Sequence, residues 1–443
     1  MEKSLDIKIK PISLIKFALP TVISNLFMSI YMMVDGIFVA NCVNTNALSA
    51  VNIVMPYVMI VLALGTMMGT GGSAVVSKLL GEGKEREAKE NFSFICLVCL
   101  IVCTLVSVLS FVFRRPLLYM LGASDLIYDY CLSYATPLFF VAPLALLGMA
   151  LQSFFIAAGK PGLGMTFSLA GGAVNIFLDW LFIARFGWET IGAALATGIG
   201  YSIPGIAGIL YFAFARKGTL SFVLPKWRGR VLLKTVTNGS SEMVAMTASG
   251  ITTIMMNTVV MKLAGEDGVA AISILIYTMS ILTSVYMGYA LGVAPVISYN
   301  FGAKNTDNLK KCHKINLRII AISSLAMYLL GFVLRNPIIS IFADKGTSVF
   351  AMAESGYLLF SISYLYSGFN MYSSSFFTAL GDGKTSAIIS FCRGLIFLTA
   401  AIYILSAFFG LNGLWLAMPA AELLGLVLTT VYLKKLKGKY NYA

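Results

Sequence analysis

Long apolar runs separated by short polar breaks fill the chain, and they restrict its fold more than any other feature. Each run holds ~20 residues or more, the length that an α-helix needs to cross the hydrocarbon core of a bilayer. A membrane-spanning segment must satisfy its own backbone hydrogen bonds, and the runs lack the alternating pattern of barrel strands, so we predict helices. The predicted spans are 13–40, 46–77, 92–113, 128–158, 162–184, 191–215, 237–262, 269–298, 315–334, 350–378, 386–409 and 413–433.

The composition excludes a water-soluble enzyme. Hydrophobic residues make up 58% of the chain and charged residues 12%, whereas soluble proteins carry ~25% charged residues. The single histidine, His313, falls in a segment that we predict as a basic loop, so catalysis or metal binding by histidines is not expected. The sequence contains no GxxxxGK[ST] motif, which leaves an ATP-driven pump unsupported. We expect no cofactor.

The net charge of +13 reports orientation in a membrane. If the N-terminus is cytoplasmic, 25 of the 32 Lys and Arg residues fall on the inner side and 6 on the outer side. This asymmetry follows the positive-inside rule and predicts an even number of spans with both termini in the cytoplasm. We therefore expect a multi-pass protein of the cell inner membrane, and no nucleic-acid partner.

The chain repeats itself after 221 residues. This shift places Gly81 on Gly302, and Phe111-Val112-Phe113-Arg114-Arg115-Pro116 on Phe332-Val333-Leu334-Arg335-Asn336-Pro337. Each half has six spans, so the halves run in the same direction, which is a transporter architecture. We predict an all-α polytopic membrane protein with two six-helix bundles related by a pseudo-two-fold axis along the membrane normal. The predicted parts are an N-terminal lobe with a cation site (1–215), a cytoplasmic linker (216–236) and a C-terminal lobe (237–443).

Ionisable residues inside spans are costly and mark functional sites by default. Asp179 lies one helical turn after Asn175, on the same face. Asp35 and Thr197 fall at a similar depth near the outer side, so these four residues are candidate ligands of one cation. Carboxylate, amide and hydroxyl oxygens suit Na⁺, and two close carboxylates can instead share a proton. Alternatively, the two aspartates are neutral or paired residues that hold helices together.

The second half carries three further ionisable residues in its predicted spans. Glu242 lies at the predicted start of a span, where it could act as a first-turn carboxylate behind a serine cap. Arg393 and Glu422 lie in adjacent spans and could form a structural ion pair or bind substrate. In the first span, Pro20 removes a backbone hydrogen bond and allows the helix to bend, although a static kink has the same signature. The 22 methionines would suit an adaptable cavity.

At these residues the sequence resembles the multidrug and toxic compound extrusion (MATE) family of secondary transporters, in its bacterial branch. The resemblance covers essentially the whole chain. The motifs that carry it are Pro20 with Val34-Asp35-Gly36, Arg114-Arg115-Pro116-Leu117, Ala158-Gly159-Lys160-Pro161, Asn175-Ile176-Phe177-Leu178-Asp179 and Gly192-Ala193-Ala194-Leu195-Ala196-Thr197.

The resemblance implies two six-helix bundles around a cavity that opens alternately to either side. It also implies export of amphipathic, often cationic drugs in exchange for Na⁺ or H⁺, by a monomer. The cation site of the first lobe maps onto Asp35, Asn175, Asp179 and Thr197. Other members carry acidic residues in the middle of spans 7 and 10, where this chain has only Glu242 and Glu354 near the starts.

Other functions remain open from the sequence. A flippase for a lipid-linked oligosaccharide or a metabolite exporter of the same superfamily would share the architecture. A membrane-embedded enzyme would need a reactive cluster that a lone His313 does not supply. A channel fits less well than alternating access, because the acidic site lies in one half only.

Overall fold

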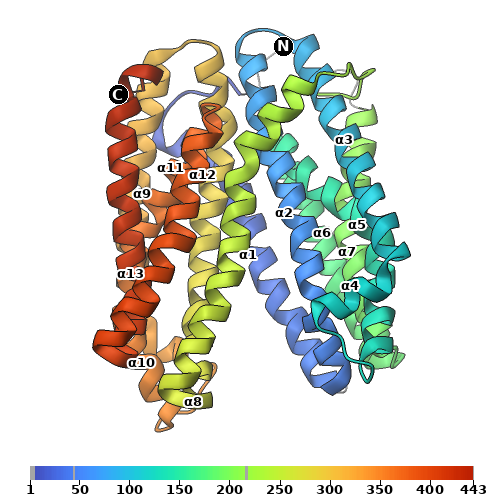
Figure 1. Cartoon of the computed structure of the whole chain (residues 1–443). Helices are drawn as coiled ribbons and strands as arrows, with labels where there is room; N and C mark the ends of the chain where they lie inside the picture. The colour runs from blue at the N-terminus through green and yellow to red at the C-terminus, as the bar shows by residue number, and fades with distance from the viewer. Residues whose placement is uncertain (1–4, 43–44, 215–217, 443) are drawn as a thin grey trace.

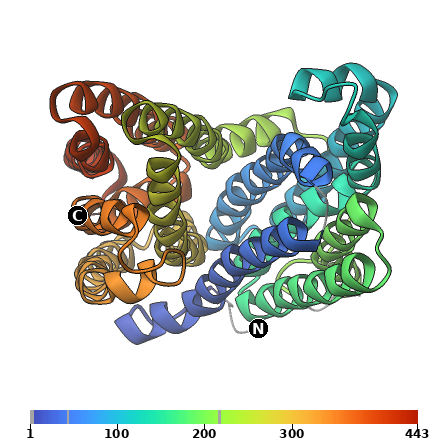
Figure 2. The same cartoon turned by 90° about the horizontal axis from the view of Figure 1, so that it is seen from below.

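The computed structural model describes residues 5–42, 45–214 and 218–442, of which the side chains of residues 32–48 are not described. They form two helical lobes that lie side by side (Figure 1, Figure 2). The N-terminal lobe holds α1 (Pro11–Cys42), α2 (Thr45–Gly81), α3 (Glu85–Val112), α4 (Arg114–Leu121), α5 (Tyr128–Ala157), α6 (Pro161–Asp179) and α7 (Glu189–Phe214). The C-terminal lobe holds α8 (Gly229–Gly302), α9 (Thr306–Ile339), α10 (Ser348–Phe360), α11 (Tyr364–Ala379), α12 (Gly383–Phe391) and α13 (Leu398–Tyr440).

The helices account for the twelve predicted spans. Within the described residues, nine helical stretches are long and apolar enough to cross a membrane. Two of these have the length of two spans, α8 with 74 residues and the stretch from α12 to α13 with 58 residues. Both bend at a glycine with positive φ, Gly265 (φ 65°) and Gly410 (φ 57°), a conformation open to residues without a Cβ atom. Together, α10 and α11 supply the remaining span, so the prediction of an all-α fold with two six-helix bundles is confirmed.

Contacts between the lobes reproduce the internal repeat. A Cβ atom on Gly81 of α2 would lie 2.0 Å from the carbonyl oxygen of Tyr299 in α8. Reciprocally, a Cβ atom on Gly302 would lie 2.1 Å from the carbonyl oxygen of Lys78. The 221-residue shift places Lys78 on Tyr299 and Gly81 on Gly302. The two contacts are therefore equivalent across the pseudo-two-fold axis, and both require glycine.

The lobes are closed at the end that carries both termini and diverge toward the opposite end (Figure 1). At the closed end, α2 also packs on the first part of α8, where a Cβ atom on Gly239 would lie 1.9 Å from the carbonyl oxygen of Met67. Helix α1 packs on the second part of α8, where a Cβ atom on Gly292 would lie 2.9 Å from the Cα atom of Ala18. Close backbone approach of this kind is typical of helix contacts in membranes.

Helix α1 belongs to the cores of both lobes. Its first turns place Leu14 and Ala18 in a buried cluster with residues of α8, α9 and α11. Further along, Phe27 packs against Gly172 of α6 in the N-terminal lobe. Pro20 lies between these two regions, inside a helix that continues on both sides. A bend at Pro20 would therefore change the angle between the parts of α1 held by different lobes.

Apolar side chains cover the outer surfaces of α3 and α9, as expected for contact with lipid. The exposed residues include Leu97, Leu100, Ile101, Leu105, Val108 and Val112 on α3, and Ile322, Leu325, Leu329, Leu330 and Val333 on α9. The three cysteines of α3, Cys96, Cys99 and Cys103, are buried on its other face without disulfides.

The segment before α8 is fastened to α3. Arg228 pairs with Glu87 and, at 3.1 Å, with Glu90, and Lys226 pairs with Glu90 at 2.9 Å. The ring of Phe222 stacks on that of Phe92 at 5.0 Å. Helix α8 then begins at Gly229, eight residues before the predicted start of its span. The sequence-based boundary missed this first part of the helix because Arg230 and Lys234 interrupt its apolar residues.

Candidate functional site

The predicted cation site depends on a close crossing of α6 and α7. A Cβ atom on Gly171 would lie 2.5 Å from the carbonyl oxygen of Gly200, and one on Gly200 would lie 2.7 Å from the Cβ atom of Asn175. The two glycines therefore bring the backbone of α7 directly against Asn175. Because the helices are antiparallel neighbours, the turn from Asn175 to Asp179 runs alongside the turn from Gly200 back to Thr197.

Three of the four predicted ligands are buried at this crossing. The exposed fractions are 1% for Asn175, 0% for Asp179 and 7% for Thr197. Both polar atoms of the Asn175 amide and the Thr197 hydroxyl lack a hydrogen-bond partner in the described part of the chain. An unsatisfied buried polar group costs ~1–3 kcal/mol, so these atoms favour a site that takes up a ligand or water.

The fourth predicted ligand, Asp35, lies in α1, but its side chain is outside those that the structure describes. Helix α1 packs against α6, with Phe27 of α1 against Gly172. Asp179 is the last residue of α6, and a π-helical turn, Trp180–Arg185, follows it directly. Such turns recur at functional sites.

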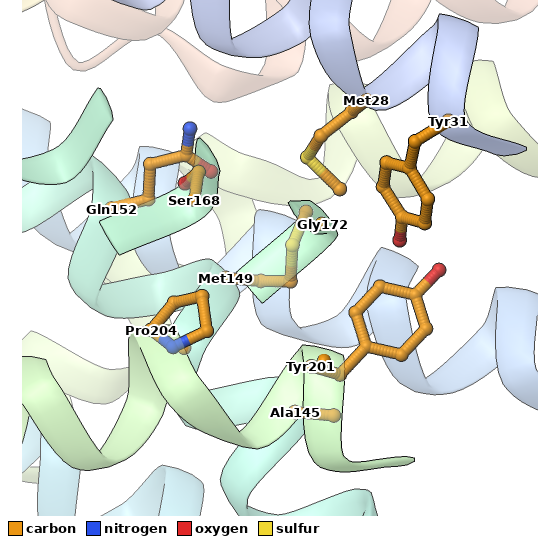
Figure 3. Close-up of a pocket in the computed structure, with 11 residues that line it drawn as sticks. Met28, Tyr31, Ala145, Met149, Gln152, Ser168, Gly172, Tyr201 and Pro204 are labelled. Atoms are coloured by element: carbon orange, nitrogen blue, oxygen red, sulfur yellow. The ribbon is translucent and has the colours of Figure 1, made fainter. Parts of the chain in front are cut away.

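A cavity of about 360 Å³, open solvent included, lies beside this crossing in the N-terminal lobe. Figure 3 shows Tyr31 of α1 and Tyr201 of α7 with their hydroxyls pointing toward one another, and their ring centroids are 6.4 Å apart. Met149 and Gln152 of α5 line the same space. Gly200 lines the cavity and also contacts Asn175, so the cavity and the candidate cation site share a wall.

These lining residues were not predicted from the sequence. Their side chains come from α1, α5, α6 and α7, and none forms a local motif. The abundance of methionine was the one signal that pointed to an adaptable cavity, and it gave no position.

In the C-terminal lobe, the half-buried Arg393 and the buried Glu422 form an ion pair with an Nη1–Oε1 distance of 2.7 Å. The amide of Asn370 donates to the other carboxylate oxygen, also at 2.7 Å, and to the backbone carbonyl of Glu422 at 2.8 Å. Thr429 donates to Asn370 at 3.1 Å. A Cβ atom on Gly425 would lie 3.1 Å from Cγ of Arg393, so a glycine there leaves room for the arginine. The partner Asn370 was not anticipated from the sequence.

Glu242 is not a first-turn carboxylate, so the capping interpretation is wrong. Helix α8 begins at Gly229, which places Glu242 in its interior. The Ser240 hydroxyl donates to the carbonyl of Thr237, and the Ser241 hydroxyl bonds with Thr378. Glu242 is 5% exposed and lines a second cavity, between the lobes.

The prediction of a loop around His313 is also wrong. His313 lies in α9 and is 6% exposed. Its Nδ1 atom lies 3.2 Å from the Tyr372 hydroxyl, and its ring centroid lies 4.5 Å from that of Phe376. The basic residues around it lie on the exposed face of a helix. A polar helix face and a loop have similar compositions, so the sequence did not distinguish them.

The comparisons with known proteins agree with this architecture. The sequence model of the MatE family matches residues 20–181 and 242–404, one match in each half. Two relatives are named multidrug export protein MepA. The one from Staphylococcus haemolyticus is 25% identical over 93% of this chain and 90% of its own length. The one from Staphylococcus aureus strain N315 is 25% identical over 95% of this chain and 93% of its own.

Solved structures share the fold. An outward-facing multidrug resistance MATE transporter superposes with a TM-score of 0.90 and 20% identity, covering 98% of this chain and 97% of its own. A mutant of the Vibrio cholerae MATE transporter VcmN superposes with a TM-score of 0.89 and 21% identity, covering 97% of both chains. Two family matches along one chain, in the two halves of one repeated fold, lead to a single conclusion: the chain belongs to the MatE family, as a bacterial-type multi-pass membrane transporter.

Proposed function

We propose that this protein is a secondary antiporter that exports amphipathic, often cationic compounds in exchange for Na⁺ or H⁺ by alternating access. The observation that carries the proposal is the shared wall between the cavity and the buried polar crossing in the N-terminal lobe. A substrate in the cavity and a coupling ion at the crossing would contact the same helices, so binding of one would affect binding of the other. The relatives named multidrug export protein MepA support the same activity.

The cavity chemistry fits an amphipathic cation. The rings of Tyr31 and Tyr201 offer faces that attract cationic groups, and the thioether of Met149 adapts to different shapes. Gln152 and Ser168 add hydrogen-bonding groups on the wall. A cavity with a small number of polar groups among flexible apolar side chains can bind substrates of different shapes.

The coupling ion would bind between Asp35, Asn175, Asp179 and Thr197. Ion binding shifts the transport cycle because its affinity differs between the conformations of the lobe. Pro20 lies where α1 passes from one lobe core to the other, so bending there would link the ion site to the contact between lobes. With both termini in the cytoplasm, as the basic residues predict, the present conformation is open to the outside. One chain contains both lobes, so we propose a monomer.

The proposal is tested in everted vesicles under an imposed Na⁺ or pH gradient, where export from the cell is measured as dye uptake into the vesicle. We expect one gradient to drive efflux by the wild-type protein, and Asp35→Asn and Asp179→Asn to abolish the driven component. The matched control is Asp344→Asn, which changes an exposed loop carboxylate. Gradient-driven efflux that persists in both site variants would remove the coupling role from these aspartates.

A further inference from the structure

The second cavity lies between the two lobes, beside their closest contacts. Thr70 and Ser73 of α2 and Ser153 of α5 line it from the N-terminal lobe, with Glu242 of α8 on the opposite side. Thr70 precedes Gly71, whose Cβ atom would lie 2.0 Å from the carbonyl oxygen of Thr235 in α8. The cavity, about 320 Å³ with open solvent included, is therefore part of the closed end.

Among the described residues that line this cavity, Glu242 is the one with an ionisable side chain. Its side chain is 95% buried by solvent exposure, and no hydrogen bond or ion pair joins its carboxylate to another residue in the described part of the chain. Arg393 interacts with it electrostatically, but that guanidinium is already paired with Glu422 at 2.7 Å. An ionised Glu242 therefore has no counterion of its own in the described part of the chain, and a buried charge without a partner is costly.

Two of the hydroxyls that line this cavity with Glu242 donate their hydrogen to backbone carbonyls. Thr70 donates its hydrogen to the carbonyl of Thr66, and Ser375 donates to the carbonyl of Ala290. A hydroxyl that has used its hydrogen presents only oxygen lone pairs to its surroundings. Oxygen lone pairs beside a carboxylate suit a hard cation, and a single carboxylate balances a single positive charge.

We propose that this interlobe cavity binds one small monovalent cation, for which Na⁺ is the best fit, between Glu242 and hydroxyls of both lobes. The site is separate from the N-terminal crossing and does not depend on its role in coupling. The hydroxyl-bearing residues are Thr70, Ser73, Ser153, Ser375 and Thr378.

A cation held from both lobes stabilises the conformation in which they meet here. If the lobes separate at this end, the ligands from α2 and α5 leave Glu242, and the affinity falls. Since a ligand shifts a conformational equilibrium by its differential affinity, Na⁺ favours the conformation that is closed at the terminal end.

The test measures the distance between the diverging ends of the lobes. Spin labels at Leu126→Cys and Ile341→Cys, both exposed, are introduced into the full-length chain with its native cysteines replaced. Double electron–electron resonance is recorded in nanodiscs while NaCl replaces N-methyl-D-glucamine chloride at constant ionic strength. We expect Na⁺ to increase the long-distance population. Glu242→Gln should raise the half-maximal Na⁺ concentration on the order of tenfold or more, because a charged ligand is lost.

The controls separate this site from the N-terminal crossing. Ser77→Ala removes a buried α2 hydroxyl outside the cavity and should keep the response to Na⁺. The double variant Ser73→Ala/Ser153→Ala should weaken it. In the Asp179→Asn background, where the N-terminal site is impaired, Glu242→Gln should still weaken the response that remains. The proposal would be overturned if the distance distribution of the wild-type protein did not change with Na⁺ or changed only with pH. It would also be overturned if Glu242→Gln responded to Na⁺ like the wild type. An equal response to Na⁺ with and without Glu242→Gln in the Asp179→Asn background would also overturn it.

Discussion

Removal of Arg393 should destabilise the protein strongly, because its partner Glu422 is 1% exposed. The carboxylate holds a 2.7 Å ion pair with Arg393 and a 2.7 Å hydrogen bond from Asn370. In Arg393→Met, the hydrogen bond remains but the charge loses its counterion. Breaking a buried pair from one side costs about 3–5 kcal/mol. We expect a loss of that size in the free energy of unfolding, measured by tryptophan fluorescence in mixed detergent micelles.

The double variant Arg393→Met/Glu422→Gln should recover most of this loss. Neither residue 393 nor residue 422 then carries a buried charge, and Asn370 keeps its 2.8 Å bond to the backbone carbonyl of residue 422. Replacing both members of a buried pair is often close to neutral. The interaction energy from the double-mutant cycle should therefore be several times the ~0.5 kcal/mol within which independent sites are additive. A loss below ~1 kcal/mol in Arg393→Met, as for exposed pairs, would refute this reasoning.

Three further predictions concern the lobe contact, the cavity and the linker. Gly239→Ala places a Cβ atom 1.9 Å from a backbone oxygen of α2, so it should open the closed end and shorten the spin-label distance at the other end. Tyr201→Ala removes a wall of the N-terminal cavity and should raise the KM for dye efflux more than it changes kcat. Arg228→Ala should cost about 1 kcal/mol of stability at low salt and less at high salt, because its pairs with Glu87 and Glu90 are partly exposed.

Each of these has its own control. Gly229→Ala adds a methyl group where nothing lies within 4 Å and should leave the distance unchanged; an equal effect of both alanines would contradict the contact argument. An unchanged KM in Tyr201→Ala would exclude the cavity as the dye site. A stability loss in Arg228→Ala that does not depend on salt would show that packing, rather than charge, holds the linker.

The features predicted from the sequence are those that a single segment or the repeat encodes. Span length follows from apolar runs, and the equivalence of Gly81 and Gly302 appears as a reciprocal contact between lobes. The pairing of Arg393 with Glu422 was one of two interpretations, and the geometry matches it because both residues lie at similar depth in neighbouring spans.

Features that depend on packing between distant segments were missed. Glu242 was expected at a helix start, but the segment before α8 is fixed by α3, and the helix begins at Gly229. His313 was expected in a loop, but one face of its helix is buried against Tyr372. The cavity in Figure 3 draws on four helices, and no periodicity within one helix indicates it.

The exchange of substrate for cation is tested most directly by using a dye gradient to drive the movement of the cation. Purified protein in liposomes is given a dye gradient with Na⁺ and H⁺ equal on both sides, and movement of both ions is followed. We predict that dye flowing down its gradient drives one of these cations in the opposite direction, and that Asp179→Asn abolishes this movement. Dye flow through the wild-type protein without any counterflow of cation would contradict antiport.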